Sequence, residues 1–236
     1  MVEIGIAMDE NLIQNISAVK SRMAAAARKS GRAPESVTLV AVSKNHDVKA
    51  IKAAVAAGIT DLGESRVQEA DQKIAALGHL ARWHLIGHLQ TNKVSRALEM
   101  FDIIDAVDSF HLAEKIDAEA ARAGRQIECL VEINSSGEDS KYGFPLEKAS
   151  QSLAELAGLK NIIWRGIMTI GPYIINEDRI RRAFRQTRDI FVASRSIFDE
   201  RFDTLSMGMS DDFELAIEEG ATQVRIGTAI FGPRAL

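Results

Sequence analysis

The sequence predicts an α/β protein folded as a single (β/α)8 TIM barrel with an extra helix before the first strand. Strand-like and helix-like segments alternate from end to end of the 236 residues. Eight of these segments are strand-like, which is the number that such a barrel needs. No proline- or serine-rich linker divides the chain. Because barrels often run as one domain of about 200–250 residues, we expect residues 1–236 to form one domain.

The expected elements follow from short apolar runs and from apolar residues that recur with a helical period. The eight expected strands centre on Leu39, Leu62, Leu85, Ile104, Leu130, Gly166, Leu205 and Ile226. Helical stripes lie between the strands, for example Val67, Ala70, Ile74 and Leu77. The helix before the first strand has an apolar side made of Leu12, Ile16, Val19 and Met23. We expect this helix to cap the bottom of the barrel.

Composition excludes several classes of protein. The formal net charge is −4, which indicates no general affinity for nucleic acid. The single cysteine, Cys129, lies in an apolar run, so we expect a buried apolar side chain and no disulfide or multi-cysteine zinc site. The N-terminus carries acidic residues and no long apolar run, unlike a signal peptide, and no apolar stretch of about 18 residues occurs anywhere. We expect a cytoplasmic protein with no membrane contact.

Lys44 is the first candidate for a chemical role. It follows the strand-like run 37–43, and TIM barrels place their chemistry at the C-terminal ends of their strands. Val40 and Val42 lie in phase with Lys44, because strand side chains alternate between the two faces. If these valines fill the barrel, the Lys44 amine lies at its mouth, where it can attack an aldehyde. The alternative is a solvated lysine at a strand end.

The turn after the seventh strand is a candidate phosphate site. Gly208 lets the chain bend closely, and we expect Ser210 to cap a helix that begins near Asp211. The first N–H groups of such a helix have no internal partner and can hold a phosphate. Asp211 and Asp212 would repel a phosphate unless they point outward, where they favour the helix dipole. An ordinary capped helix is the alternative.

A second turn with glycine and a hydroxyl group follows the eighth strand, at Gly227 and Thr228. Barrels frequently bind phosphate with the loops after strands seven and eight, so the coincidence strengthens the phosphate interpretation. Arg225 is a charge within the eighth strand and needs a partner if it is buried. One alternative is a structural ion pair with Glu64 or Glu132. The other places the guanidinium, which can only donate, against an unprotonated pyridine nitrogen.

A lysine that can form a Schiff base, an anion site and an arginine for a ring nitrogen together suggest pyridoxal 5′-phosphate (PLP). Other polar residues give weaker signals. His84 and His88 stand four apart without a third ligand nearby, so we expect no metal site. Segment 177–201 is rich in arginine, which indicates a solvated helix face or, alternatively, a surface for an anionic partner. Its arginines are Arg179, Arg181, Arg182, Arg185, Arg188, Arg195 and Arg201.

Several motifs resemble those of the pyridoxal phosphate homeostasis proteins, the YggS/PROSC family, and they occur in that family's order over nearly the whole chain. They are Ala41-Val42-Ser43-Lys44, Gly63-Glu64 with Val67-Gln68-Glu69, Trp83-His84-Leu85-Ile86-Gly87 with Leu89-Gln90 and Asn92-Lys93, the run Leu205 to Asp212, and the run Val224 to Gly232. The resemblance implies a single-domain barrel like the N-terminal domain of bacterial alanine racemase.

The resemblance also implies a cofactor and its contacts. The family binds PLP through an internal aldimine, which maps onto Lys44. Its phosphate contacts map onto Ser210, Gly227 and Thr228, and its pyridine-nitrogen contact maps onto Arg225. The family is regarded as a carrier or buffer of the cofactor in vitamin B6 homeostasis, without robust turnover. We therefore expect a monomer whose protein partners are PLP-dependent apoenzymes.

One departure from the family's pattern and three functional hypotheses are left open. After Gly63-Glu64 the family usually has Asn-Tyr, whereas this chain has Ser65-Arg66, which puts one polar contact at the mouth in doubt. Our main hypothesis is a non-catalytic PLP carrier with no catalytic residue. The alternative is a fold-type III amino-acid racemase or lyase, with Lys44 as one base and a second base from Tyr142, Tyr173 or His84. A third hypothesis is a barrel aldolase that uses the lysine without cofactor.

Overall fold

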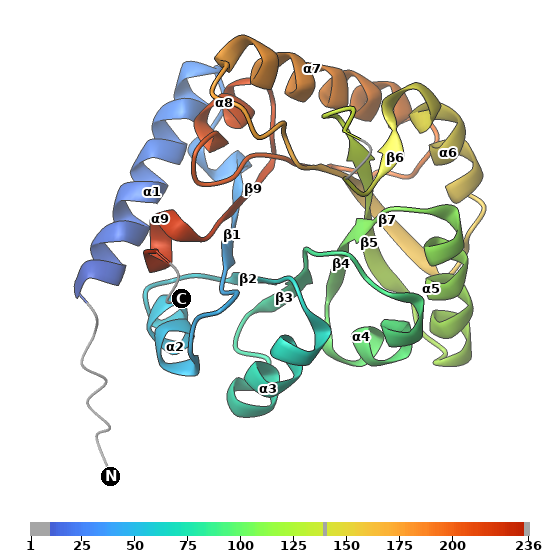
Figure 1. The fold of residues 1–236 in the computed structure, drawn as a ribbon, viewed down its shortest axis with the longest axis horizontal. Coiled ribbons are helices and arrows are strands. Elements are labelled where there is room, and N and C mark those ends of the chain that lie inside the picture. The colour runs from blue at the N-terminus through green and yellow to red at the C-terminus, as the bar shows by residue number, and fades with distance from the viewer. Residues whose placement is uncertain (1–9, 139–140, 234–236) are drawn as a thin grey trace.

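Eight parallel strands close into the barrel that the sequence predicts, with helices around the outside (Figure 1). The computed structural model describes residues 10–138 and 141–233. The strands are β1 (Thr38–Val42), β2 (Asp61–Glu64), β3 (Arg82–Leu85), β4 (Ile103–Val107), β5 (Ile127–Asn134), β7 (Ile162–Thr169), β8 (Thr204–Ser206) and β9 (Gln223–Ile226). Each of the eight expected centres lies within one of these strands, and β9 pairs with β1 to close the ring.

A short extra strand was not predicted. β6 (Phe144–Pro145) pairs in parallel with the end of β5. It has two residues, too few to produce a recognisable alternation of side chains. Because β5 also pairs with β7, β6 is an appendage at the mouth and not part of the closed ring.

The helices cover the outer face of the barrel, and their apolar stripes explain why they lie there. They are α1 (Glu10–Lys29), α2 (Val48–Ala56), α3 (Val67–Leu77), α4 (Val94–Met100), α5 (Phe110–Arg122), α6 (Ala149–Leu156), α7 (Glu177–Ser194), α8 (Phe213–Glu218) and α9 (Thr228–Phe231). Short 3₁₀ turns precede β1, α4 and α6; they are Pro34–Ser36, Thr91–Lys93 and Leu146–Lys148. In the described residues, no helix combines the length and hydropathy that crossing a bilayer requires.

The N-terminal helix does not cap the bottom of the barrel, contrary to the sequence expectation. α1 lies in the outer ring, beside α8, α9 and α2 (Figure 1). The reason is that α9 has only four residues, so it leaves the outer face around β9 and β1 uncovered. α1 covers this face with the predicted stripe, and Leu12, Ile16, Val19 and Met23 are all buried.

Most of the apolar core lies between the strands and the helices, and the buried Cys129 belongs to it as expected. Inside the barrel, the buried apolar residues form a small separate cluster of Ile103, Ala106, Leu130 and Met168. A register irregularity in β4 between Ile104 and Val107 allows consecutive residues Asp105 and Ala106 both to belong to the interior. Barrel interiors are usually packed with branched apolar side chains, so this one is unusually polar.

Candidate functional site

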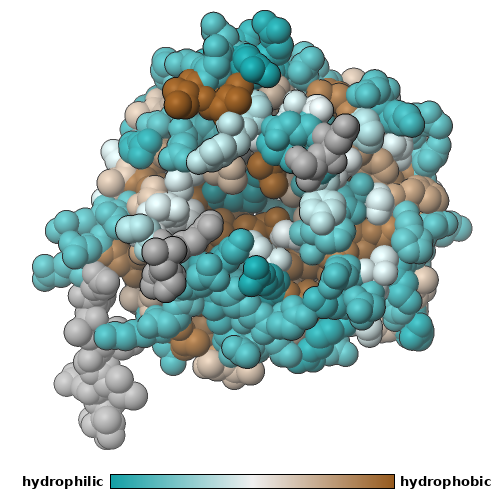
Figure 2. All heavy atoms as spheres, in the orientation of Figure 1, coloured by the Kyte–Doolittle hydropathy of each residue, from teal (hydrophilic) through white to brown (hydrophobic). Residues whose placement is uncertain are grey.

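A cavity of about 320 Å³ opens among the C-terminal ends of the strands. Its lining includes all five residues that the sequence analysis selected, namely Lys44, Ser210, Arg225, Gly227 and Thr228. Figure 2 shows a hollow in the middle of this face of the molecule, ringed mainly by hydrophilic residues. The volume lies within the range of sites for small ligands, about 300–1,000 Å³. Residues from the first strand and from the last two strands thus meet at one place.

Lys44 enters this cavity from the turn that follows β1. Within the described residues its amine has neither a hydrogen bond nor an ion pair, and the side chain is half-buried. The next residue, Asn45, has a φ of 62°, an uncommon value for a residue other than glycine. Its N–H donates to Glu69 Oε1 at 2.5 Å. The chain therefore turns sharply after Lys44 and leaves the amine free.

A buried cluster on the outer side of the barrel holds this turn in place. The Ser43 hydroxyl donates to Glu64 Oε1 at 2.6 Å. The Lys73 amine, from α3, donates to the Ser43 carbonyl, to Glu64 Oε1 and to Glu69 Oε1, each at 2.7 Å. Burial raises the pKa of Glu64, although Lys73 and Ser43 act in the opposite direction. We call Ser43, Glu64, Glu69 and Lys73 the outer cluster.

The outer cluster contains a buried residue that was not predicted. Lys73 is buried between Ala70 and Leu77 on α3, beside the predicted Ile74, which is half-buried and packs against the core. A lysine at a buried position of an amphipathic helix requires a carboxylate partner, and Glu64 at the end of β2 supplies it. The sequence signal was a charge within an apolar stripe, and it was missed because Ile74 also fits the helical period.

The turn after β8 is built differently from the expectation. Ser210 does not cap α8; its Oγ instead accepts from the Ala229 N–H, 3.3 Å away in the turn after β9. The residue that precedes α8 is Asp212, which is buried and does not point outward. Its carboxylate accepts from the Met209 N–H at 2.6 Å, and burial raises its pKa. Asp211 is the exposed carboxylate, and it lines the cavity.

Gly208 is needed where the chain leaves β8. Its φ is +98°, and a Cβ at this position would lie 2.6 Å from the Ala216 Cβ. Its carbonyl accepts from the Arg225 N–H at 3.0 Å. The turns after β8 and β9 are therefore tied together by two hydrogen bonds, one from Arg225 and one through Ser210. This places hydroxyl groups and backbone N–H groups at one edge of the cavity.

Arg225 lies on the inner wall of the cavity and is only 3% exposed. Its Nη1 donates to Ser206 Oγ at 2.6 Å, and its Nη2 donates to the Thr169 carbonyl at 2.8 Å. Of the two ion-pair partners considered from the sequence, Glu64 is wrong, because it belongs to the outer cluster. Glu132 makes no hydrogen bond with Arg225 in the described residues, but the two charges influence each other.

Burial shifts the pKa values of Arg225 and Glu132 in opposite directions. Burial lowers the pKa of Arg225, against the attraction of Asp105, Glu132 and Asp212. Burial and the nearby Asp108 raise the pKa of Glu132 from 4.5 to about 7, although Arg225 lowers it. An uncharged form of Glu132 is therefore accessible near neutral pH, and the charge beside Arg225 depends on pH.

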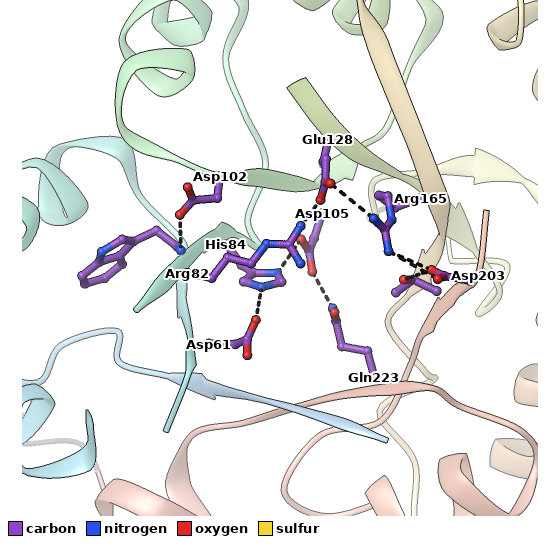
Figure 3. A network of polar contacts seen from close by, with 11 residues as sticks. Asp61, Arg82, His84, Asp102, Asp105, Glu128, Arg165, Asp203 and Gln223 are labelled. Atoms are coloured by element: carbon purple, nitrogen blue, oxygen red, sulfur yellow. Dashed lines mark hydrogen bonds and ion pairs between the residues drawn. The ribbon is translucent and has the colours of Figure 1, made fainter. Parts of the chain in front are cut away.

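His84 is the centre of a polar network inside the barrel (Figure 3). Its Nδ1 lies 3.0 Å from Asp105 Oδ1, and its Nε2 lies 3.1 Å from Asp61 Oδ1. Burial alone would lower the pKa of His84, but the two carboxylates outweigh it and raise the pKa from 6.5 to about 9. At neutral pH both ring nitrogens carry protons and donate. His84 is therefore unsuited to act as the second base, a role for which the racemase or lyase hypothesis considered it.

The two tyrosines considered as second bases do not line the cavity. Tyr173 is 92% exposed. Tyr142 is 57% exposed and stacks on His88, with ring centroids 4.0 Å apart. His88 Nδ1 in turn contacts Asp108 Oδ2 at 2.5 Å. In residues 10–138 and 141–233 no three His, Cys, Asp or Glu side chains gather in a way that could hold a metal ion.

The arginine-rich helix is only partly a solvated face. Arg181 on α7 pairs with Glu218 and Glu219 at the end of α8 and with Glu177 on its own helix. Arg185 pairs with Glu219 at 3.0 Å. These contacts join α7 to the C-terminal end of α8. Much of the positive charge of α7 is therefore neutralised within the molecule.

Comparison with known proteins relates nearly the whole chain to one family. A sequence model of that family, described as alanine racemase, N-terminal domain, matches residues 14–235. The pyridoxal phosphate homeostasis protein of Escherichia coli K12 is 38% identical over 230 residues, which are 95% of this chain and 97% of the relative. The chain belongs to this family.

Two solved structures are similar over nearly the whole chain. A protein from Bifidobacterium adolescentis has a TM-score of 0.90 and 38% identity, covering 98% of each chain. PipY of Synechococcus elongatus, in a structure with PLP bound, has a TM-score of 0.81 and 36% identity. This match covers 94% of the present chain and all of PipY. The fold and the family predicted from the motifs are thereby confirmed.

Proposed function

We propose that the protein binds PLP at the mouth of the barrel and holds it covalently through Lys44, as a carrier in PLP homeostasis. The observation that carries this proposal is the meeting of Lys44, Arg225 and the two terminal turns in one cavity. The relatives named as PLP homeostasis proteins and the PLP-bound PipY structure support it. Bound PLP would supply an aldehyde that condenses reversibly with a primary amine.

The residues present fit this cofactor by their chemistry. An anionic phosphate requires donors, and Ser210, Thr228 and the backbone of Gly227 supply hydroxyl and N–H groups at one edge. An unprotonated pyridine nitrogen requires a donor, and the Arg225 guanidinium lines the inner wall. An aldehyde requires an unpaired amine, and Lys44 has no partner in the described residues. The exposed Asp211 opposes the phosphate, and its carboxylate has to turn toward solvent.

The carrier function is favoured over the racemase or lyase alternative by the surroundings of Lys44. Racemisation requires a positioned acid or base on each face of the substrate. His84 is enclosed by two carboxylates, and Tyr142 and Tyr173 lie outside the lining. We retain as predictions that the chain functions as one domain, as a cytoplasmic monomer, and that PLP-dependent apoenzymes are its partners.

The test is covalent labelling of Lys44. We expect the purified protein mixed with PLP to show the absorbance of a protonated Schiff base, and borohydride reduction to fix the cofactor on the peptide that contains Lys44. The Lys44→Ala variant should lose both signals completely, because no other described amine lines the cavity. Lys49→Ala, a change at an exposed lysine of α2, is the matched control. Labelling of another lysine in the wild-type protein would contradict the proposal.

A further inference from the structure

The network around His84 continues without interruption to the arginine of the cavity. Gln223 Nε2 donates to Asp105 Oδ2 at 2.8 Å and to Ser206 Oγ at 2.9 Å. The same Ser206 Oγ accepts from Arg225 Nη1 at 2.6 Å. Asp105, Gln223, Ser206 and His84 are all buried, and Figure 3 shows that His84, on the neighbouring strand β3, and Gln223, on β9, both approach Asp105.

The direction of each hydrogen bond in this network is fixed by chemistry. Asp105 can only accept, so the His84 ring and the Gln223 amide must both donate to it. Gln223 therefore turns its NH₂ group, and not its carbonyl, toward Ser206. Arg225 can also only donate, so Ser206 Oγ accepts from two sides. Asp105 thus determines the orientation of every group between itself and the guanidinium.

The charges along the network are also favourable for Arg225. His84 is an imidazolium at neutral pH between the carboxylates of Asp61 and Asp105, so these three groups together carry one negative charge. Asp105 attracts Arg225 at the other end of the network, in addition to Glu132 and Asp212. A buried guanidinium without a direct carboxylate partner would be costly, and here the excess negative charge of the network lies two hydrogen-bonded residues away. The arginine is stabilised without losing all its donors to a carboxylate.

We propose that Asp105, acting through Gln223 and Ser206, is the positioning residue that presents the Arg225 guanidinium to the ring nitrogen of the ligand. A direct carboxylate partner would hold the guanidinium in a bidentate pair and compete with the ligand. The relay through a hydroxyl and an amide fixes Nη1 while the guanidinium still lines the cavity. This proposal rests on the function proposed above, because it assumes a ligand with a ring nitrogen.

The experiment compares PLP with its 1-deaza analogue, in which a carbon replaces the ring nitrogen. The dissociation constants of both ligands are measured by absorbance for the wild type and for Asp105→Asn and Ser206→Ala. Asp105→Asn turns one acceptor oxygen into a donor, so the side chain no longer accepts from both His84 and Gln223, and Ser206→Ala removes the hydroxyl acceptor. We expect the wild type to prefer PLP, and each variant to reduce that preference by about tenfold, the effect of losing one charge-assisted hydrogen bond.

The matched control is Asp203→Asn, which removes a carboxylate paired with Arg165 in another part of the same barrel. This control should keep the wild-type preference. Urea unfolding and circular dichroism establish that each variant is folded before its ligands are compared. If Asp105 and Ser206 had a purely structural role, both variants would bind PLP and the 1-deaza analogue more weakly by the same factor. The preference for PLP would then be unchanged, which would overturn the proposal. A wild type without preference would overturn it as well.

The outcome is separable from that of the proposed function. If borohydride does not attach PLP to Lys44 in the wild type, the proposed function fails, whatever the ring-nitrogen preference. If Lys44 is labelled but Asp105→Asn and Ser206→Ala keep the full preference for PLP, the function stands and the positioning role of Asp105 fails. Arg225→Met provides the reference for a site that has lost its contact with the ring nitrogen.

Discussion

The two cations of the cavity, Lys44 and Arg225, are supported in opposite ways. Behind Lys44, the outer cluster binds the backbone, because Lys73 and Glu69 hold the Ser43 carbonyl and the Asn45 N–H. The amine itself has no partner in the described part of the chain. Behind Arg225, the network of Asp61, His84, Asp105, Gln223 and Ser206, which we call the inner network, binds the side chain. Ser206 Oγ accepts from the guanidinium, as does the Thr169 carbonyl.

The difference follows from what each group has to do. An amine that forms and breaks a covalent bond must be able to move, so only its point of attachment can be held firmly. A guanidinium that recognises one ring atom gains from a fixed orientation, because less conformational freedom is then lost on binding. The two supports are also separated by the barrel wall: the outer cluster lies toward α3, and the inner network lies inside the ring. They can therefore be disrupted independently.

The largest expected effect comes from breaking the outer cluster. Lys73→Met leaves Glu64 buried without a compensating charge, and removal of one partner of a buried ion pair costs about 3–5 kcal/mol. We expect the free energy of unfolding, measured with urea, to fall by that amount. Lys29→Met, which breaks the exposed pair with Glu218, is the control and should cost at most about 1 kcal/mol. An equally small loss for Lys73→Met would show that the outer cluster does not anchor the turn.

The inner network predicts that the free energy of unfolding falls at alkaline pH, because of the raised pKa of His84. The pKa of His84 is raised from 6.5 to about 9 in the folded protein, so the folded state holds a proton that the unfolded chain releases. This stabilisation is complete below pH 6.5 and is lost as the pH rises through 9. Its size is roughly 3 kcal/mol, from about 1.36 kcal/mol per pKa unit. Nitrogen NMR of the His84 ring should show two N–H groups at about pH 8; a neutral ring there would contradict the network.

Glu132 tests whether a third carboxylate acts on Arg225. Its pKa is raised from 4.5 to about 7 by burial and by Asp108, so its contribution to stability is complete below pH 4.5 and is lost as the pH rises through 7. Glu132→Gln removes this loss. We expect the variant to match the wild type near pH 4.5 and to exceed its free energy of unfolding near pH 8 by up to about 3 kcal/mol. If the variant and the wild type had equal free energies of unfolding near pH 8, Glu132 would be well solvated.

The same contrast explains what could be predicted from the sequence. The barrel followed from local periodicity, because each strand and helix carries its own apolar pattern. Lys44 and Arg225 were recognisable because each is a charge at a defined position of a strand. Their supports were not. Lys73 was hidden by Ile74, which also fits the helical period of α3, and Asp105 reaches Gln223, 118 residues away in the chain, only because the barrel closes.

The corrections have the same physical origin. Ser210 was expected to cap the following helix, which is a local interaction. In the structure it accepts from Ala229, an interaction that exists only because β8 and β9 are neighbours. α1 was expected at the bottom of the barrel, but the shortness of α9 left a more favourable apolar face at the side. Single-sequence patterns predicted the elements and did not predict competition between distant partners.

The smallest expected effect is a change in the dissociation constant for PLP, produced in the part of the cavity near Lys44. Ser65 lines the cavity at the position where the family usually has asparagine. Asparagine has a carbonyl acceptor and two amide donors, and it reaches farther than serine. If Ser65→Asn adds one neutral hydrogen bond to the ligand, worth about 0.5–1.5 kcal/mol, the dissociation constant for PLP should fall about two- to tenfold, as measured by absorbance titration.

The matched change is Arg66→Tyr at the neighbouring exposed position, which does not line the cavity. It should leave the dissociation constant unchanged, because its side chain lies outside the site. Since Ser65 lies on the Lys44 side of the cavity, the gain from Ser65→Asn should be equal for PLP and for its 1-deaza analogue. A gain confined to PLP would mean that Ser65 communicates with the ring nitrogen, and the separation between the two supports would then be incorrect.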